Sequence, residues 1–388
     1  MKRIIDQKKK RILIITAYIK PINMGGGSNA EAFSEFLRHK GFSVKLLSKT
    51  NTGFFYRIDK NKINVRWPNS IPLKVFSLLW IFPLSLFFCL TSNVIFFVSK
   101  HYPLVPFLML FCKVFRKKIV FRSSLIGDDD PFTILKKNSW HSKISLFAIK
   151  QATVFHSINP AFTESYIKAF NTKKNVVETS QGVDTSTFTI KLRKHKEAFC
   201  KELNINPEVP IILSVGFLIN RKGFKGMFEI LAEIKHDFTY LIVGDYRLPI
   251  NHPLYYLNYE MYENYYFGSD LLKSKVRFLG PITDMKNIYA IADILLMNSY
   301  AEGTPNVLLE AMACGVVPVV RELPGYRDFL IKNGENSLLF KSISEAKSGI
   351  ENLLLNQNQM NQFSQNATIF ADSSFSFEAT WNRLIEKL

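Results

Sequence analysis

The stretch Asn298–Gly315 reads NSYAEGTPNVLLEAMACG and holds two carboxylates, Glu302 and Glu310, around a turn of small residues. The apolar run Ile294–Met297 in front of it predicts a buried strand. A helical pattern leaves the turn near Asn306, which is a good N-cap residue. Glu302 would therefore lie on the loop before a helix, and Glu310 would lie about one turn inside that helix.

The turn before this helix is predicted to bind an anion. Four of its backbone amides are expected to have no partner within the helix and to point at one spot: those of Thr304, Asn306, Val307 and Leu308. Carboxylates on either side of the turn are good acceptors for sugar hydroxyls. A phosphate held between two hydroxyl-bearing rings describes a nucleotide sugar.

Two more features of the sequence are typical of phosphate sites. The stretch Gly216–Gly223 reads GFLINRKG and follows the apolar run Ile211–Val215, which predicts another strand. Arg221 and Lys222 then lie between a strand end and a helix, where two cations can neutralise a diphosphate. The glycine run Gly25–Gly27 follows the first predicted strand and is expected to be a turn that opens a helix.

Short apolar runs alternate with helical patterns along the chain, which predicts parallel sheets with crossover helices. The expected helices include Ser28–His39 and Phe224–Ile234. The expected strands are Arg11–Tyr18, Phe42–Leu47, Val94–Val98, Lys118–Phe121, Thr153–Ser157, Ile211–Val215, Tyr240–Val243, Val276–Leu279, Ile294–Met297 and Val317–Val320. Because the pattern restarts after a polar, basic stretch, we expect two doubly wound domains with a hinge near residues 185–195.

The charge of the chain is unevenly distributed. The 388 residues are 47% hydrophobic, which excludes a disordered chain, and carry a net charge of +18. Residues 1–190 hold 29 Lys and Arg against 10 Asp and Glu, whereas residues 191–388 hold 21 against 22. This asymmetry indicates an anionic partner for the N-terminal half. The four cysteines are widely spaced, which favours a reducing compartment over disulfides or a zinc site.

The segment Val75–Ser99 has no charged residue and is long enough to suggest a membrane span. Pro83 and a polar break at residues 91–93 favour instead a buried helix followed by a strand, with a helix that dips into a membrane surface as the second choice. A further apolar stretch, Leu104–Phe115, ends in three basic residues that would attract anionic headgroups. We therefore expect a cytoplasmic protein, bound peripherally to the inner face of the plasma membrane. The basic N-terminus is not followed by an apolar run long enough for a signal peptide.

Residues 299–320 resemble the retaining glycosyltransferases of family 4, also described as glycosyl transferases group 1. That family has a Glu, seven residues, Glu motif in the context pS…EG.pnvllEAmAcG.PVv, which this stretch matches almost word for word. Gly182–Asp184 resembles the family's GVD run into the interdomain hinge. Val276–Gly280 and Ala292–Asp293 resemble the segment whose backbone contacts the nucleotide base. The resemblance covers about residues 150–350.

The resemblance implies the GT-B fold, in which two doubly wound, Rossmann-like α/β domains face each other across a cleft. An N-terminal domain of residues 1–188 would bind the acceptor, and a C-terminal domain of residues 189–371 would bind a nucleotide sugar. A C-terminal helix within residues 372–388 is expected to pack back on the N-terminal domain.

The resemblance also implies roles for single residues. Glu302 would hold the hydroxyls of the donor sugar, and Glu310 would hold those of the ribose. Lys222, together with Arg221, would neutralise the diphosphate and stabilise the charge that develops on the leaving group. The other expected donor contacts are Gly26, Gly27, Leu279, Gly303, Thr304, Pro305, Asn306 and Val307. No enzyme nucleophile, metal ion or cofactor is expected.

Three features depart from the family pattern or compete with it. Phe217 stands where the family usually has an arginine, and Arg221 is the obvious substitute. The stretch Phe121–Ser124 lacks the histidine that the family often has there, so His101 is a candidate stand-in, although a surface or packing role is favoured for it. Asp128–Asp130 could bind a divalent cation, but an acceptor-side loop is favoured.

The expected function is retaining transfer of a hexose or N-acetylhexosamine from a nucleoside-diphosphate sugar, with a UDP sugar favoured. The acceptor would be a glycan or a lipid-linked saccharide, and assembly of a bacterial cell-surface polysaccharide fits best. The expected partners are the donor, the acceptor and an anionic membrane surface, but no nucleic acid. Two alternatives stay open: a nucleotide-sugar epimerase of the same fold, and a non-enzymatic basic protein that binds nucleic acid or another anionic surface.

Overall fold

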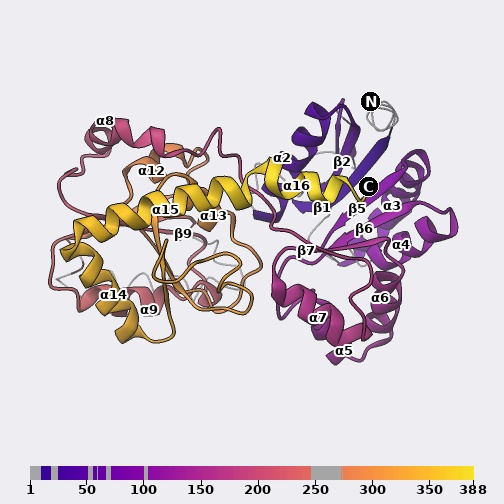
Figure 1. Ribbon diagram of the computed structural model, residues 1–388. Helices are drawn as coiled ribbons and strands as arrows, with labels where there is room; N and C mark the ends of the chain where they lie inside the picture. Colours follow the sequence, from indigo (N-terminus) through magenta and orange to yellow (C-terminus); the bar gives the residue numbers. More distant parts are fainter. Residues whose placement is uncertain are drawn as a thin grey trace. The chain divides into compact units, whose positions relative to one another are not determined.

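The computed structural model describes residues 10–18, 25–50, 56–58, 60–66, 71–99, 104–245, 272 and 274–388. The chain divides into two compact units, which are described separately (Figure 1). Unit 1 comprises Met1–Gln181 and Thr380–Leu388, and unit 2 comprises Gly182–Ala379. The expectation for His101 concerns a residue outside the described ranges.

Unit 1 is built on an eight-stranded sheet in the order β3-β4-β2-β1-β5-β6-β7-β8. Its strands are β1 Arg11–Tyr18, β2 Ser43–Thr50, β3 Tyr56–Ile58, β4 Lys62–Arg66, β5 Val94–Val98, β6 Lys118–Arg122, β7 Val154–Ser157 and β8 Val176–Glu178. All neighbouring strands pair in parallel except β3 with β4. A parallel sheet is covered on both faces, which explains why β5 is apolar and buried along its whole length.

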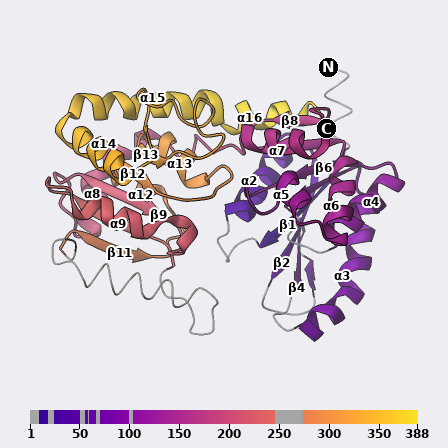
Figure 2. The same ribbon diagram turned by 90° about the horizontal axis from the view of Figure 1, so that it is seen from below.

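Helices cover both faces of this sheet (Figure 2). Along β5, Ile95 and Phe97 pack in a core with α3 Ile71–Thr91, α4 Val105–Val114, α6 Trp140–Lys150 and α7 Pro160–Phe170. Because side chains alternate along a strand, Phe96 points to the opposite face, where α2 Gly25–His39 lies. The last helix, α16 Phe377–Ile385, joins α2 there, since the ring of Trp381 lies edge-on to Phe33 at 4.9 Å.

Unit 2 contains a six-stranded sheet in the order β11-β10-β9-β12-β13-β14, and every pairing in it is parallel. The strands are β9 Ile211–Val215, β10 Thr239–Val243, β11 Val276–Gly280, β12 Ile294–Met297, β13 Val317–Arg321 and β14 Leu338–Phe340. The α-helices among the described residues of this unit are α8 Lys196–Glu202, α9 Phe224–Ala232, α12 Lys286–Ile291, α13 Asn306–Ala313, α14 Ile343–Leu355 and α15 Gln357–Phe375. One apolar core lies on each face of the sheet.

The predicted alternation of strands and helices is confirmed in both units. The strands Ile211–Val215 and Ile294–Met297 begin and end where the sequence pattern places them. The fold class, two doubly wound α/β units, is therefore confirmed. The short β3–β4 hairpin at the edge of unit 1 was not predicted.

The glycine run Gly25–Gly27 is not the turn that the sequence predicts. It forms the first turn of α2, which begins at Gly25 rather than at Ser28. Glycine can adopt helical dihedrals as well as turn conformations, so composition alone does not fix the boundary. The amides that a helix leaves unpaired at its start are consequently those of the glycines themselves.

The charge-free segment Val75–Ser99 forms the helix α3 and the strand β5, as predicted. Pro83 lies within α3. Across the described ranges, no helix combines the length and apolarity needed to cross a membrane.

Candidate donor site in unit 2

The candidate site lies where the strand order of unit 2 reverses. From β9 the chain runs outward through β10 and β11, and it then returns to β12 on the other side of β9. Ligands of doubly wound sheets bind at such a switch point, beyond the carboxyl ends of the strands. The loop after β9 carries Arg221 and Lys222, and the loop after β12 carries Glu302. The topology thus brings together two features that lie 80 residues apart in the sequence.

Two glycines shape the loop after β9. Gly216 has a φ of +145°, and a Cβ at this position would lie 3.1 Å from Cε of Lys222, so the lysine side chain lies across the glycine. Gly223 has a φ of +68°, and a Cβ there would lie only 2.0 Å from the carbonyl oxygen of Asn298. The loop can approach β12 this closely only because Gly223 has no side chain.

Arg221, Lys222 and Glu302 form an ion-pair cluster. Nζ of Lys222 lies 2.7 Å and Nη1 of Arg221 lies 3.0 Å from Oε1 of Glu302. Arg221 also donates to the carbonyl oxygen of Ala301 at 2.6 Å. Arg221 therefore occupies the place beside Lys222 that the sequence suggested for it, and two cations face one carboxylate.

The ion-pair cluster keeps Glu302 ionised. Burial tends to raise the pKa of Glu302, but the charges of Lys222 and Arg221 and the hydrogen bond from Lys222 outweigh it and hold the pKa below its ordinary value. Side-chain exposure is 10% for Glu302 and 15% for Lys222. With two cations against one anion, the cluster has a net positive charge and would attract a further anion.

The helix α13 begins directly after this cluster, but not as predicted. Its N-cap is Pro305, and Asn306 is the first helical residue. The amide of Leu308 donates to the carbonyl oxygen of Pro305 at 3.2 Å, so it does not take part in the predicted set of unpaired amides. A cap needs only an extended residue whose carbonyl accepts the first bond, and proline meets that requirement. Asn306 and Val307 lie in the first turn of α13, which is the part of a helix where anions bind.

Glu310 lies one turn inside α13, as predicted, and is held by Tyr289 of α12. The Tyr289 hydroxyl donates to Oε2 of Glu310 at 2.9 Å. Burial raises the pKa of Glu310 to about 7, although the tyrosine hydrogen bond works in the opposite direction. Oε1 has no hydrogen bond within the described part of the chain. Glu310 is thus an oriented carboxylate that can accept hydrogen bonds from a ligand.

The other predicted donor contacts are distributed over three elements. Gly303, Thr304 and Pro305 are buried, and Val307 is half-buried on α13. Leu279 is half-buried on β11, which is separated from β9 by β10. Gly26 and Gly27 belong to the first turn of α2 in unit 1. That turn follows β1, and β1 and β5 flank the switch point of the unit 1 sheet.

Sequence reasoning missed Asn298, which is fully buried at the end of β12. Its Nδ2 donates to the carbonyl oxygen of Gly223 at 2.9 Å, and its Oδ1 accepts from Nε of Arg321 at 2.6 Å. Asn298 therefore fixes the start of α9 against β12 and holds a third cation near the switch point. A polar residue directly after a buried strand was the available signal.

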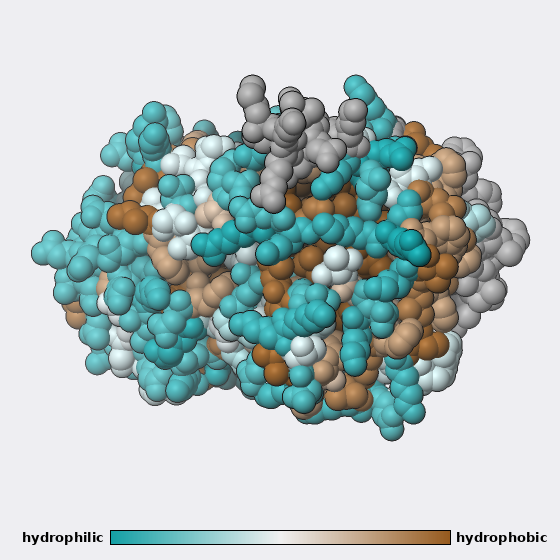
Figure 3. Space-filling view, turned by 45° about the vertical axis from the view of Figure 1, so that its right-hand side comes forward, coloured by the Kyte–Doolittle hydropathy of each residue, from teal (hydrophilic) through white to brown (hydrophobic). Residues whose placement is uncertain are grey.

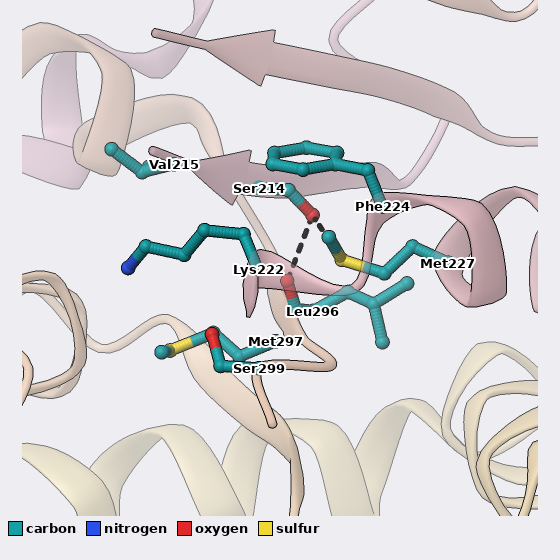
Figure 4. Close-up of a pocket in the computed structure, with 8 residues that line it drawn as sticks. All are labelled: Ser214, Val215, Lys222, Phe224, Met227, Leu296, Met297 and Ser299. Atoms are coloured by element: carbon teal, nitrogen blue, oxygen red, sulfur yellow. Dashed lines mark hydrogen bonds between the residues drawn. The ribbon is translucent and has the colours of Figure 1, made fainter. Parts of the chain in front are cut away.

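A small pocket lies beneath the lysine of this site (Figure 4). It is lined by Ser214, Val215, Lys222, Phe224, Met227, Leu296, Met297 and Ser299, and its volume is about 10 Å³. That volume is comparable with one water molecule, so the pocket is too small for a nucleotide. The dashed lines mark hydrogen bonds from Ser214 to Met227 and to the carbonyl oxygen of Leu296, which connect residues of the pocket wall.

Tyr326 was also missed by sequence reasoning. Its side chain is buried, and its hydroxyl has no hydrogen-bond partner among the described residues. The group lies within electrostatic range of Glu302 and Arg221, and burial raises its pKa well above the ordinary value.

We expect Tyr326→Phe to leave the protein as stable as before or to stabilise it by up to ~2 kcal/mol, because an unpaired buried hydroxyl costs ~1–3 kcal/mol. Thermal unfolding of the unliganded protein measures this change. A fall in Tm of several degrees would show that the hydroxyl has a partner. Tyr289→Phe is the matched comparison, because it removes a hydroxyl that is hydrogen-bonded to Glu310.

The Asp128–Asp130 stretch of unit 1 is engaged within its own loop. Both oxygens of Asp129 accept from the amide of Ser124. Asp130 is the N-cap of α5 Pro131–Lys136 and accepts from the amide of Thr133. No cluster of three or more potential metal ligands occurs in the part of the chain that the structure describes. These two aspartates therefore contribute to the structure of the loop.

Comparison with known proteins agrees with the motif. Residues 195–370 match the family described as glycosyl transferases group 1, which confirms the resemblance seen at residues 299–320. Sucrose-phosphate synthase from Thermosynechococcus elongatus has a similar structure, with a TM-score of 0.77 at 16% identity over 97% of this chain and 98% of that chain. The Anabaena protein HepE, in complex with UDP and glucose, gives 0.72 at 17% identity over the same shares. These similarities confirm the GT-B fold.

According to their names, two curated relatives are glycosyltransferases that act on a lipid-linked saccharide or on a lipid. One is the N,N'-diacetylbacillosaminyl-diphospho-undecaprenol alpha-1,3-N-acetylgalactosaminyltransferase of Campylobacter jejuni, 31% identical over 34% of this chain. The other is the processive diacylglycerol alpha-glucosyltransferase of Acholeplasma laidlawii, 25% identical over 45% of this chain. The matches span 31% and 51% of the lengths of these relatives, respectively.

Proposed function

We propose that this protein is a retaining glycosyltransferase of family 4. It would transfer a hexose or N-acetylhexosamine from a nucleoside-diphosphate sugar to a glycan or a lipid-linked saccharide. The observation that carries the proposal is the ion-pair cluster of Arg221, Lys222 and Glu302, which is net positive and whose Glu302 lies in the loop that leads into α13. The two cations of the cluster would bind the diphosphate and the Glu302 carboxylate would bind the sugar, so the cluster suits a sugar diphosphate.

The donor would bind along the carboxyl ends of β9 and β12. Its diphosphate would lie between the ion-pair cluster and the first amides of α13, because both supply positive potential. Glu310 would accept from the ribose hydroxyls, with Tyr289 fixing its orientation. Leu279 and its neighbours on β11 would contact the base. Glu302 would hold the sugar hydroxyls, and the phosphates would replace it as the partner of the cations.

The chemistry would rest on electrostatic stabilisation of the leaving group. As the bond from the anomeric carbon to the diphosphate breaks, negative charge grows on the β-phosphate. Before the donor binds, Glu302 and the carbonyl oxygen of Ala301 hold Lys222 and Arg221 at the positions from which they would meet that charge. Groups that are oriented before the reaction need no reorganisation during it. We assign no enzyme nucleophile, so attack would come from the acceptor on the face that the diphosphate leaves.

The names of the relatives support a lipid-linked or glycan acceptor, and assembly of a bacterial cell-surface polysaccharide on the cytoplasmic side of the membrane is the process that we favour. A UDP sugar is our first choice of donor, since HepE has the same fold and was solved with UDP and glucose.

A thermal-shift panel of UDP, GDP and ADP sugars tests the proposal. The correct donor, at 100 times its Kd, stabilises the protein by ~2.7 kcal/mol. Release of nucleoside diphosphate is then measured with and without candidate acceptors. Turnover that requires an acceptor supports glycosyl transfer, whereas sugar epimerisation without acceptor supports the epimerase alternative. If no nucleotide sugar binds, and random duplex DNA binds in a salt-sensitive manner, the enzymatic assignment is wrong.

We expect donor binding and turnover without a divalent cation. Arg221, Lys222 and the start of α13 already supply the positive potential that a metal ion would provide. The turnover rate in EDTA should therefore stay within about twofold of the rate without EDTA. Parallel assays with added Mg²⁺ and Mn²⁺ check this proposed metal independence. If EDTA abolishes turnover and Asp129→Asn does the same, the phosphate site has been assigned to the wrong unit.

A further inference from the structure

The helices α3, α4 and α6 of unit 1 expose large apolar side chains at their C-terminal ends. Val114, the last residue of α4, is 76% exposed, and Phe115, the C-cap of this helix, is 49% exposed. Phe87 and Leu90 are exposed in the last turns of α3, and Phe147 is exposed in the last turn of α6. We call these five side chains the helix-end surface. Soluble proteins rarely gather such residues on one face without a partner.

The topology places these helix ends along one edge of the sheet. Each helix ends a few residues before the next strand begins, at β5, β6 and β7 respectively. Those three strands are parallel neighbours, so their amino ends, and hence the helix ends, share an edge. Nζ of Lys117, which follows α4, donates to the carbonyl oxygen of Leu90 at 2.6 Å and so joins the ends of α3 and α4. Figure 1 shows α3, α4 and α6 grouped on this side of unit 1.

The charged side chains beside the helix-end surface on its own helices are basic. Lys113, Arg116 and Lys150 are exposed beside its apolar residues and have no ion-pair partner among the residues that the structure describes. The sequence has no Asp or Glu in residues 60–127 or in residues 131–163, which include all three helices. On this side of the molecule, Figure 3 shows brown apolar surface interleaved with teal hydrophilic surface.

We propose that the helix-end surface docks unit 1 onto a bilayer of anionic lipids, with its apolar side chains in the interface and its cations at the headgroups. Apolar groups ringed by lysine and arginine match that boundary in both polarity and charge. A second copy of the chain suits the surface poorly, because a twofold contact would place like charges against each other. The surface lies at the amino ends of the strands, so docking leaves the carboxyl edge of the sheet accessible.

Flotation with vesicles tests this proposal independently of glycosyl transfer. The full chain should float with vesicles of equal phosphatidylcholine and phosphatidylglycerol, and much less with phosphatidylcholine alone. Lys113→Gln combined with Arg116→Gln should weaken binding roughly thirtyfold, since each cation near an anionic surface contributes ~1 kcal/mol. Val114→Ser combined with Phe115→Ser should weaken it at least about tenfold through the apolar contact that is lost.

The matched control is Leu355→Ser combined with Ile369→Ser, which removes apolar side chains that are 68% and 66% exposed in unit 2. This control should float like the unchanged protein. All variants should have the Tm of the unchanged protein, because the altered side chains are exposed. The proposal is overturned if the control loses as much binding as the Val114 and Phe115 pair. It is also overturned if the protein does not bind vesicles but sediments as a dimer, and the Val114→Ser, Phe115→Ser variant sediments as a monomer. A protein that binds a soluble polyanion through Lys113 and Arg116 but does not bind anionic vesicles would overturn it as well.

Discussion

Alanine in place of Lys222 is expected to lower kcat/KM for donor consumption by roughly a hundred- to a thousandfold, the usual effect of deleting one preorganised charge-stabilising group. The Lys222 ammonium is held 2.7 Å from Glu302 and lies across Gly216, so its position is fixed before the donor arrives. Its loss removes half of the positive charge that we assign to the leaving phosphate. The smaller part of the effect should appear in KM and the larger part in kcat, because the charge on the β-phosphate grows as the bond breaks.

The matched control for this variant is Lys286→Ala. Lys286 pairs with Asp284 at 3.3 Å on the surface of the same unit, and such exposed pairs contribute little to stability. The Lys222→Ala protein should also stay folded, since Glu302 keeps Arg221 as a partner. A loss of less than threefold in kcat/KM, with an unchanged Tm, would show that Lys222 does not face the leaving group.

The fold could be predicted because each local pattern agreed with the global architecture. The strands Ile211–Val215 and Ile294–Met297 are buried on both faces, so they appear in the sequence as almost entirely apolar runs, interrupted only by Ser214. The β3–β4 hairpin was not predicted because β3 is a short edge strand and β4 alternates polar and apolar residues, so neither forms such a run. Gly25–Gly27 was misplaced because glycine is compatible with both a turn and the first turn of a helix.

The candidate site could be predicted only in part. The sequence placed Glu302 and Glu310 around a helix start, and the structure keeps that order. It could not show that Glu302 is paired with Lys222, because that contact depends on β9 and β12 being neighbours in the sheet. Pro305 took the cap position from Asn306 because backbone dihedrals, not residue preference, decide which carbonyl closes the first turn. The raised pKa of Glu310 comes from burial, which only the packed structure determines.

Glu310→Gln is expected to weaken the binding of free nucleoside diphosphate and of intact donor alike. Losing a charged acceptor of hydroxyl hydrogen bonds costs ~1.5–3 kcal/mol, or about ten- to a hundredfold in Kd. The fold should survive, because the Tyr289 hydroxyl can donate to the amide oxygen instead. Calorimetry with both ligands measures the effect, and Glu302→Gln is the comparison. Glu302→Gln should not weaken the binding of free nucleotide, because it releases Lys222 and Arg221 for the phosphates. It should lower turnover, because the sugar is then misoriented. Equal losses of nucleotide affinity in both variants would contradict the assignment of ribose to Glu310.

The same carboxylate should make donor binding depend on pH. Burial raises the pKa of Glu310 to about 7, and the ionised form accepts from both ribose hydroxyls, so donor affinity should rise about tenfold from pH 6 to pH 8. The diphosphate of an intact donor is a diester that does not titrate in this range. Stability should change in the opposite sense: the folded chain keeps this proton up to about pH 7, whereas the unfolded chain releases it near 4.5, so the stabilisation is complete below pH 4.5 and is lost as the pH rises to 7. In Glu310→Gln the pH dependence of donor affinity and this contribution to stability should both be lost, while other titrating groups such as His156 keep their own effect on stability. If the donor affinity of that variant still rose between pH 6 and pH 8, a group other than Glu310 would control donor binding in this range.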